Sequence, residues 1–291
     1  MNSTTTKIFK NLMLLVILSF LMFSCTKKEG EESTEKIDNE SSKPVKVVSW
    51  DKLKEKNGIM YEFMKSIPFT GKSEKYTKDS LLYQEKTYKL GKLNGKMTFR
   101  YSNGQKEFEL FWLSGKKHGK SLKWAKDGQL LMEEHYQHGT FHGTNKEWYN
   151  NGKLKARVHF KEGKNHRKSE YFYENGQISI EQNYLDGEKD GETIYWYENG
   201  QMKGKGKFIR NIVDGPVAGW WDNGNKQYEG TYKNGKMTGT FFNWYTDGKI
   251  KSEENFKNDV KDGNFIKYDK QGNVTEKIYY KDGIVTKRVV G

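Results

Sequence analysis

The sequence has little cysteine, few aliphatic residues and no long apolar run. A single cysteine, Cys25, among 291 residues excludes an internal disulfide framework and a cysteine-rich metal site. The apolar side chains are mostly Tyr, Phe and Trp, whereas a compact globular domain would contain more Leu, Ile, Val and Ala. No apolar run reaches the ~20 residues that a membrane-spanning helix needs. These absences argue against a compact disulfide-bonded domain and against a transmembrane helix.

The sequence is rich instead in charge, aromatic rings and glycine. Charged residues make up 31% of the chain and aromatic residues 14%, and there are 30 glycines. High charge is typical of disordered chains, but such chains are poor in aromatic residues, so disorder is not expected for most of this one. The many tyrosines, tryptophans and Asn-Gly pairs indicate β-hairpins.

The first 25 residues have the pattern of an export signal. A basic n-region precedes an apolar run from Leu12 to Phe23, and Ser24 precedes the only cysteine. This run has the length of a signal-peptide h-region. The stretch LMFSC at residues 21–25 resembles the lipobox of bacterial lipoproteins, which implies that residues 1–24 are removed and that Cys25 is lipidated. A secreted protein with a free cysteine, or a short buried helix, are the alternatives.

Residues 25–45 predict a disordered tether behind that cysteine. They are mostly polar, contain no aromatic residue, and cannot bury enough apolar surface to fold. Thr26, rather than an aspartate, follows Cys25, which by resemblance to Gram-negative lipoproteins implies the bacterial outer membrane. The acidic cluster in this segment resembles export tags of surface-exposed lipoproteins. The expected membrane contact is therefore the N-terminal lipid.

Positive charge is concentrated in the remainder of the chain. The whole chain has a formal net charge of +13 at pH 7. Residues 46–291 carry about this charge by themselves, because residues 26–45 are net acidic and Lys7 and Lys10 lie in the signal segment. Excess lysine spread over a long surface usually forms a solvated face. Such a surface also attracts anionic lipid, polysaccharide or an acidic protein.

One motif recurs every 24 residues through most of the chain. An aromatic residue stands eight residues after each turn glycine, and another stands four residues before it in all of these copies but the first. An earlier, degenerate copy begins at Gly71, which makes about nine copies. The turn glycines, most of them preceded by Asn or Asp, are Gly104, Gly128, Gly152, Gly176, Gly200, Gly224, Gly248 and Gly272.

Each copy predicts one β-hairpin. Asn-Gly and Asp-Gly tolerate positive φ at both central positions, which favours a two-residue type I′ turn with Tyr149 opposite Leu154. The aromatic residue eight after the glycine shares the face of that tyrosine, and the tryptophan series lies on the other face. A G-x-x-x-G loop then leads to the next copy. The predicted fold is all-β: an elongated single domain of antiparallel hairpins in a solenoid or meander, with a cap at residues 46–70 and the repeat array at 71–291.

A family resemblance follows from this motif. The pattern G-x-x-x-x-W-Y-x-N-G-x-(L/I/M)-x-x-E-x-x-(Y/F)-x-x-G-x-x-x-G, as in residues 191–215, resembles the MORN repeat variant. The resemblance extends over residues 68–286 and implies a MORN-like repeat scaffold. Bacterial proteins with this repeat are often described as antitoxin components of toxin–antitoxin modules, so the resemblance also implies an antitoxin-like inhibitor of a cognate toxin.

The sequence predicts no catalytic residue, no metal site and no cofactor. It contains no Ser-His-Asp order, no nucleophile elbow, no phosphate-binding loop and no HExxH motif. His118, His142 and His166 occupy one repeat position, about 10 Å apart, which is too far to share one metal ion. Glutamates recur five residues after most turn glycines, and such a ladder favours salt pairing with lysine over a catalytic pair. We therefore expect that the chain is not an enzyme.

The tryptophans that precede the turn glycines are the candidate binding residues. Trp148, Trp196, Trp220 and Trp244 form either a second packed ladder or an exposed stripe, and an exposed contiguous apolar surface marks an interaction site. The leading hypothesis is a lipid-anchored, non-catalytic scaffold for another protein or an envelope polymer. The alternatives are the antitoxin-like inhibitor and a membrane-surface or lipid-binding module. Export argues against nucleic acid as a partner.

Overall fold

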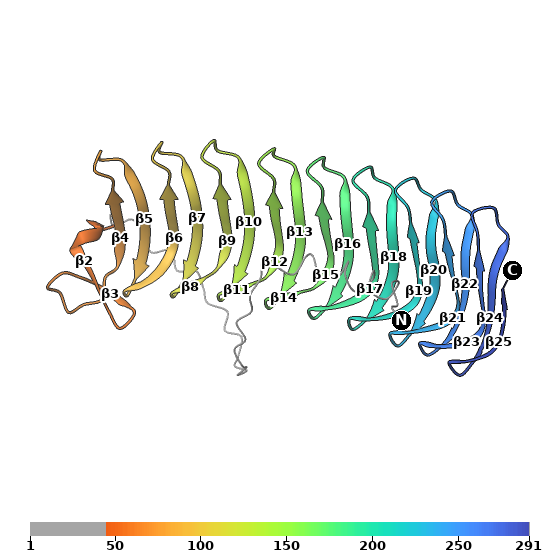
Figure 1. Cartoon of the computed structure of the whole chain (residues 1–291). Coiled ribbons are helices and arrows are strands. Elements are labelled where there is room, and N and C mark those ends of the chain that lie inside the picture. The colour runs from red at the N-terminus through yellow and green to blue at the C-terminus, as the bar shows by residue number, and fades with distance from the viewer. Residues whose placement is uncertain (1–44, 291) are drawn as a thin grey trace. The chain divides into compact units, whose positions relative to one another are not determined.

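The computed structural model describes residues 45–290. The predicted signal peptide, Cys25 and residues 25–44 of the predicted tether lie outside the described residues. Within the described part, no helix is long and apolar enough to cross a membrane. β-strands and the turns between them make up nearly all of this region (Figure 1).

The strands form one 23-stranded sheet and a separate pair, β2–β3. Strands that follow one another in the chain pair antiparallel, so nine hairpins stand in sequence order, as predicted (Figure 1). The N-terminal elements are β1 (Val47–Ser49), the 3₁₀ helix η1 (Trp50–Lys52), β2 (Leu53–Lys56) and β3 (Ile59–Glu62). The first four hairpins comprise β4 (Gly71–Tyr76), β5 (Leu82–Lys89), β6 (Lys92–Arg100), β7 (Lys106–Leu113), β8 (Lys116–Lys117), β9 (Gly119–Trp124), β10 (Leu130–Gln137), β11 (Thr140–Phe141), β12 (Gly143–Trp148) and β13 (Leu154–Lys161).

The remaining five hairpins continue in the same order. They comprise β14 (Lys164–Asn165), β15 (Arg167–Phe172), β16 (Ile178–Leu185), β17 (Glu188–Trp196), β18 (Met202–Ile209), β19 (Ile212–Trp220), β20 (Lys226–Lys233), β21 (Lys236–Trp244), β22 (Ile250–Lys257), β23 (Val260–Tyr268) and β24 (Val274–Lys281). A last strand, β25 (Ile284–Val290), pairs with β24. In three hairpins the first strand is split in two, as in β8 and β9.

The turn at the Asn-Gly pair between β12 and β13 has three residues instead of the predicted two. The N–H of Gly152 donates to the carbonyl of Tyr149 (3.0 Å), and the N–H of Tyr149 donates to the carbonyl of Lys153 (2.9 Å). Gly152 has a φ of +82°, and Asn151 is not among the residues with positive φ. This pattern is a type I turn followed by a glycine bulge. The predicted type I′ turn and the predicted Tyr149–Leu154 pair are therefore wrong, because Leu154 pairs with Trp148.

Type I′ turns occur instead at the other end of each strand, within the predicted G-x-x-x-G loop. Asp186 and Gly187 have φ values of +51° and +90° and connect β16 to β17 through the pair Leu185–Glu188. Two positive φ values in a two-residue loop define this turn. Its first position varies so widely that the sequence does not reveal it: Leu90, Ser114, His138, Glu162, Asp186, Arg210, Asn234, Asn258 and Asp282.

Side chains at the glycine turns connect neighbouring hairpins. The amide of Asn151 donates to the carbonyl of Glu174, 23 residues further along the chain, at 2.9 Å. The hydroxyl of Tyr149 donates to the carbonyl of Phe172 at 2.7 Å. Equivalent bonds recur in other hairpins, with the donors Asn103, Asn175, Asn199, Asn223, Tyr101, Tyr173, Tyr197 and Tyr245. These bonds hold successive turns in register.

The sheet has two chemically different faces. In β17 and β18, Thr193, Tyr195 and Phe208 lie on one face and Trp196 on the other, because side chains alternate along a strand. We call the face with Phe208 and its equivalents the aromatic face, and the face with Trp196 the charged face. This separation agrees with the prediction that the tryptophan series and the aromatic residues after the turns lie on opposite faces.

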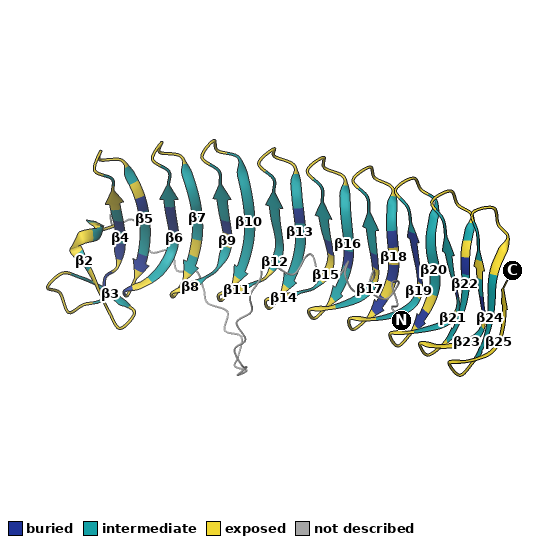
Figure 2. Cartoon of the chain, viewed as in Figure 1, coloured by how far each residue is buried: buried dark blue, intermediate teal, exposed yellow. Residues whose placement is uncertain are grey.

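The buried residues follow the aromatic face. One strand position in each hairpin is buried in eight of the nine copies, and Figure 2 shows these residues recurring in dark blue along the sheet. Small hydroxyl residues fill this position in several copies, and larger apolar residues fill it toward the C-terminus. The buried members are Ser73, Met97, Ser121, Ser169, Thr193, Val217, Phe241 and Phe265.

The N-terminal elements cover the first hairpin. β1 pairs parallel with β4, which makes the large sheet mixed at this end. Met60, Phe69 and Tyr88 form a buried cluster there, and the rings of Phe69 and Tyr88 lie 5.8 Å apart. β1 thus covers the edge of β4 that would otherwise be unpaired. An unpaired edge strand is a template for association with another chain.

Candidate functional site

A ladder of rings lines the aromatic face. In the C-terminal hairpins the ring centroids of successive members lie 4.9 to 5.6 Å apart, and these pairs meet edge to face. The members are Tyr232, Phe241, Phe256, Phe265 and Tyr280. The ladder combines the aromatic residue eight after each turn glycine with rings from the strand beside it. It gives the aromatic face of the C-terminal hairpins a continuous series of rings.

Three lysines lie over rings of the aromatic face. The ammonium of Lys117 is 4.6 Å from the ring centroid of Tyr136, and that of Lys189 is 5.6 Å from the centroid of Phe208. Lys261 lies over two rings. None of the three forms an ion pair with another residue of the described part. Burial lowers the pKa of Lys189, because the charged ammonium loses solvation.

Ion pairs recur on the charged face, as the recurring glutamates predict. Lys120 pairs with Glu133 at 2.8 Å, and Lys168 pairs with Glu181 at 2.7 Å. Partial burial acts to raise the pKa of Glu133, but the hydrogen bond and charge of Lys120, together with the nearby Lys146 and His135, outweigh it, so the pKa lies below its usual value.

The four predicted binding residues, Trp148, Trp196, Trp220 and Trp244, are all half-buried. The ring of Trp244 lies 5.9 Å from that of Phe242, and the ammonium of Lys226 lies 5.3 Å above it. The series is thus neither a fully exposed stripe nor a buried core, and its role in binding stays a prediction. Trp148 also lines a hollow of the surface.

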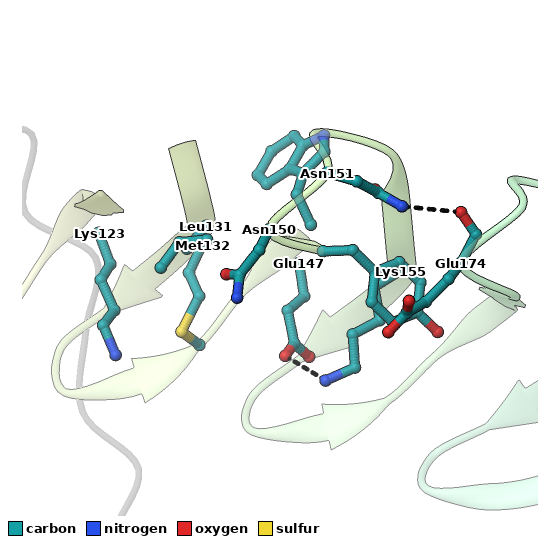
Figure 3. Close-up of a pocket in the computed structure, with 10 residues that line it drawn as sticks. Lys123, Leu131, Met132, Glu147, Asn150, Asn151, Lys155 and Glu174 are labelled. Atoms are coloured by element: carbon teal, nitrogen blue, oxygen red, sulfur yellow. Dashed lines mark hydrogen bonds and ion pairs between the residues drawn. The ribbon is translucent and has the colours of Figure 1, made fainter. Parts of the chain in front are cut away.

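Two adjoining hollows lie over β6 to β13. The smaller, of about 340 Å³, has walls of Phe99, Phe108, Leu110 and Met132. The larger, of about 460 Å³, extends toward Tyr149, and Figure 3 shows Lys123, Leu131, Met132, Glu147 and Lys155 around it. Lys123 and Met132 line both. Hollows are the usual places where proteins bind ligands.

Sequence reasoning missed Phe108 and Met132. They occupy a strand position on the aromatic face that holds a different residue in every copy: Gln84, Phe108, Met132, Ala156, Ile180, Gly204, Tyr228, Ser252 and Glu276. The repeat itself hides such a position, because the motif is defined by what recurs. The signal that identifies this position is its variation from copy to copy. A position with a purely structural role would hold the same kind of residue in every copy.

The histidines do not form a metal centre. No group of three or more His, Cys, Asp or Glu side chains that could hold a metal ion occurs among residues 45–290. The rings of His118 and His138 lie 5.2 Å apart. Burial lowers the pKa of His159, and the nearby Arg167 adds to this effect.

Comparison with known proteins identifies the repeat. The model of the MORN repeat variant matches seven segments: 117–138, 141–162, 168–186, 189–209, 213–234, 237–258 and 261–282. The match begins two hairpins later than the resemblance predicted, although β4 to β7 form hairpins of the same kind. No curated protein matches the chain.

Solved structures give little further information. Crystal structures of TcdB2-TccC3-Cdc42 and of TcdB2-TccC3 match with 14% identity over 76% of this chain. Their TM-scores are 0.18 and 0.15, and the chain spans only 14% of the length of those chains. The seven matched segments cover slightly more than half of the sequence, and the hairpins of the structure coincide with them. The chain therefore belongs to the MORN repeat variant family.

Proposed function

We propose that the chain is a lipid-anchored, non-catalytic scaffold of the bacterial envelope that binds a partner along its aromatic face. The rings of the aromatic face with unpaired lysines over them carry this proposal. On the charged face Lys120 and Lys168 pair with glutamates, whereas Lys117 and Lys189 on the aromatic face lie over rings without an acidic partner in the described part. Unpaired charge beside aromatic surface suits recognition of an acidic or mixed partner.

Photo-cross-linking in cells tests which face binds. A photoreactive phenylalanine analogue is placed at Phe108, which lines a hollow, or at Phe111, which lies on the same strand but on the charged face and is 38% exposed. The proposal predicts a discrete adduct from position 108 and none from position 111. An adduct only from position 111, or from neither, would contradict it.

The N-terminal anchor needs its own experiment. Cells are labelled with a palmitate analogue, and the wild type is compared with Cys25→Ala. We expect the label in the outer-membrane fraction for the wild type and no label for the variant. An unlabelled, full-length wild-type chain in the cytoplasm would contradict the anchor and would favour an intracellular antitoxin-like inhibitor.

The free lysines of the aromatic face also favour a membrane-surface module as a second candidate. Anionic lipid attracts juxtaposed lysines, and this attraction falls with salt. Co-sedimentation of the chain lacking its lipid with vesicles containing anionic lipid separates the two functions. Salt-sensitive binding that is lost in Lys189→Glu would favour the membrane module, and no binding at any salt would remove it.

The N-terminal segment has a supporting role in this proposal. Residues 46–70 act as the cap of the array, because β1 pairs with the edge of β4 and Met60 and Phe69 bury Tyr88. Repeat arrays need such ends, since an open terminal repeat exposes its interface. The cap prevents the first strand of the array from pairing with an edge strand of another molecule, and it leaves the aromatic face accessible to the partner.

A further inference from the structure

The smaller of the two hollows has an apolar wall that suits a partner's side chain. The rings of Phe99 and Phe108 lie 6.3 Å apart at an interplanar angle of 82°, and Leu110 and Met132 complete the wall. Methionine is common at surfaces that accept varied apolar side chains, because its thioether is flexible and polarisable. This wall accepts an aliphatic or aromatic side chain more readily than a sugar ring, which needs more hydrogen-bonding groups.

Ser121 places an unsatisfied hydroxyl in the smaller hollow. Its side chain is 2% exposed, and its Oγ has no hydrogen-bond partner among the described residues. A buried polar atom without a partner is unfavourable, and such atoms are uncommon in folded proteins. A backbone N–H or C=O of a bound chain would supply the missing partner.

Lys123 stands where the two hollows meet. Its ammonium lies 5.4 Å from the ring centroid of Phe108, and it forms no ion pair with the described residues. Lys120, on the same strand β9 but on the charged face, pairs with Glu133. The unpaired ammonium where the two hollows meet favours a carboxylate between two apolar side chains of a partner.

Two of the three carboxylates that line the hollows are engaged by other groups, and the third, Glu174, forms no ion pair in the described part. Glu147 pairs with Lys155 at 2.6 Å, as Figure 3 shows, and Glu134 accepts a hydrogen bond from the hydroxyl of Tyr136 at 2.9 Å. Neither is within ion-pair distance of Lys123. The positive charge of Lys123 is therefore available to a partner.

The spacing of the copies selects a backbone conformation for that partner. Equivalent points on neighbouring hairpins are two strands apart, or ~9.6 Å. A polyproline II helix has three residues per turn and advances ~9.3 Å per turn, so every third side chain faces the same way at nearly this distance. A β-strand brings side chains to one face every ~6.7 Å and would lose register with the hollows.

We propose that these hollows bind an extended acidic segment of a partner protein in the polyproline II conformation, with an apolar side chain at every third position. One apolar side chain enters the smaller hollow beside Phe108, the next enters the larger hollow beside Met132, the equivalent residue of the next copy, and an acidic side chain between them pairs with Lys123. This inference rests on the proposed function, because it takes the aromatic face as the binding face.

Fluorescence anisotropy tests the proposal with the purified full-length chain and a labelled peptide of four Leu-Pro-Glu units. We expect saturable binding that Lys123→Glu weakens about tenfold, because it places a carboxylate against the acidic peptide. The next copy has Glu147 at this position, so the variant is expected to fold. Lys205→Glu is the control: it makes the same charge change on the charged face, where other copies carry glutamate.

A second variant keeps the test independent of charge. Ser121→Val fills the smaller hollow, and Val217 occupies the equivalent position of a later copy, so the sheet accommodates it. It should abolish binding of the peptide without lowering the melting temperature.

Several outcomes would overturn the inference. Equal binding of a scrambled peptide of the same composition would exclude the period of three, and equal binding of a Leu-Pro-Lys peptide would exclude the acidic preference. Stronger binding of a polyuronate, of single-stranded DNA or of anionic vesicles would assign the hollows to another partner. A cross-link from Phe108 without binding of the peptide would leave the proposed function intact and refute this inference alone.

Discussion

Arg167 occupies a backbone position that glycine fills in the other complete copies. Its φ is +67°, in the left-handed region, where a residue with a Cβ is strained. The equivalent Gly143 and Gly191 have φ values of +96° and +109°. The interruption of the glycine series at this residue was visible in the sequence, but only the structure shows that the backbone keeps its conformation despite the change.

Arg167→Gly should therefore stabilise the protein. Removing the strain raises the free energy of unfolding by about 1–2 kcal/mol. The greater conformational freedom of glycine in the unfolded chain lowers it again by about 0.5–1 kcal/mol. We expect a higher melting temperature by calorimetry. Gly143→Ala is the matched control and should lower the melting temperature, and an equal fall for both variants would refute the strain.

Acid should weaken the charged face through its glutamates. Burial acts to raise the pKa of Glu133, but Lys120 and the nearby Lys146 and His135 together outweigh it, so the folded-state pKa lies below the usual 4.5. A carboxylate with a lowered pKa stabilises the fold above its unfolded pKa, and this contribution is lost as pH falls through the folded pKa. The melting temperature should fall less between about pH 5 and pH 3 in Glu133→Gln than in the wild type. An identical fall in both would show that the pair contributes nothing.

At the scale of the hairpin, glycine and asparagine have different reasons for their positions. The sequence predicted the hairpins, their number and the separation of the two faces, because these follow from periodicity. It misplaced the type I′ turns, since Asn-Gly was taken as a signal of positive φ. Asn151 is suited to its position by its side chain: Oδ1 accepts from the N–H of Lys153 at 3.0 Å, and Nδ2 donates to the next hairpin.

The packing of one strand on the next also depends on single glycines. Gly230 lies under the ring of Phe241, and a Cβ at residue 230 would overlap that ring. Phe241 is 4% exposed and belongs to the ring ladder with Tyr232. The pairing of a bare backbone with a large ring lets the ladder continue through this hairpin.

Gly230→Ala should destabilise the protein by about 1–3 kcal/mol, because Phe241 must leave its position. Chemical denaturation measures the loss. Thr231→Ala, the next residue but on the exposed charged face, is the control and should change stability by about 0.5 kcal/mol or less. Similar effects of the two variants would show that Phe241 accommodates the methyl group.

At the scale of the whole array, the regular sheet and the hollows have different origins. The sheet follows from positions that repeat, so it was predictable from one chain. The hollows arise where non-repeating residues such as Phe108 and Met132 meet across neighbouring strands, and a motif cannot report them. The tryptophans were predicted as binding residues because they recur, which is also what a structural position does.

Deletion of one whole copy, residues 189–212, tests the modular character of the array. It joins Glu188 to Val213, which preserves the turn, the strand direction and the faces. We expect unchanged circular dichroism per residue and a modest fall in melting temperature, because one interface between neighbours is lost. Deletion of half a copy, residues 189–200, reverses every later strand and should abolish cooperative unfolding. Equal behaviour of the two deletions would contradict the nearest-neighbour account.

Lysine footprinting in intact cells tests the central claim, that the partner lies on the aromatic face, most directly. The acylation rates of Lys117, Lys123 and Lys189 are compared with those of Lys120 and Lys168 in cells and in the purified chain. The account predicts that the first three are protected in cells relative to the purified chain and that the two on the charged face are not. Protection confined to Lys120 and Lys168, or no protection at either face, would contradict it.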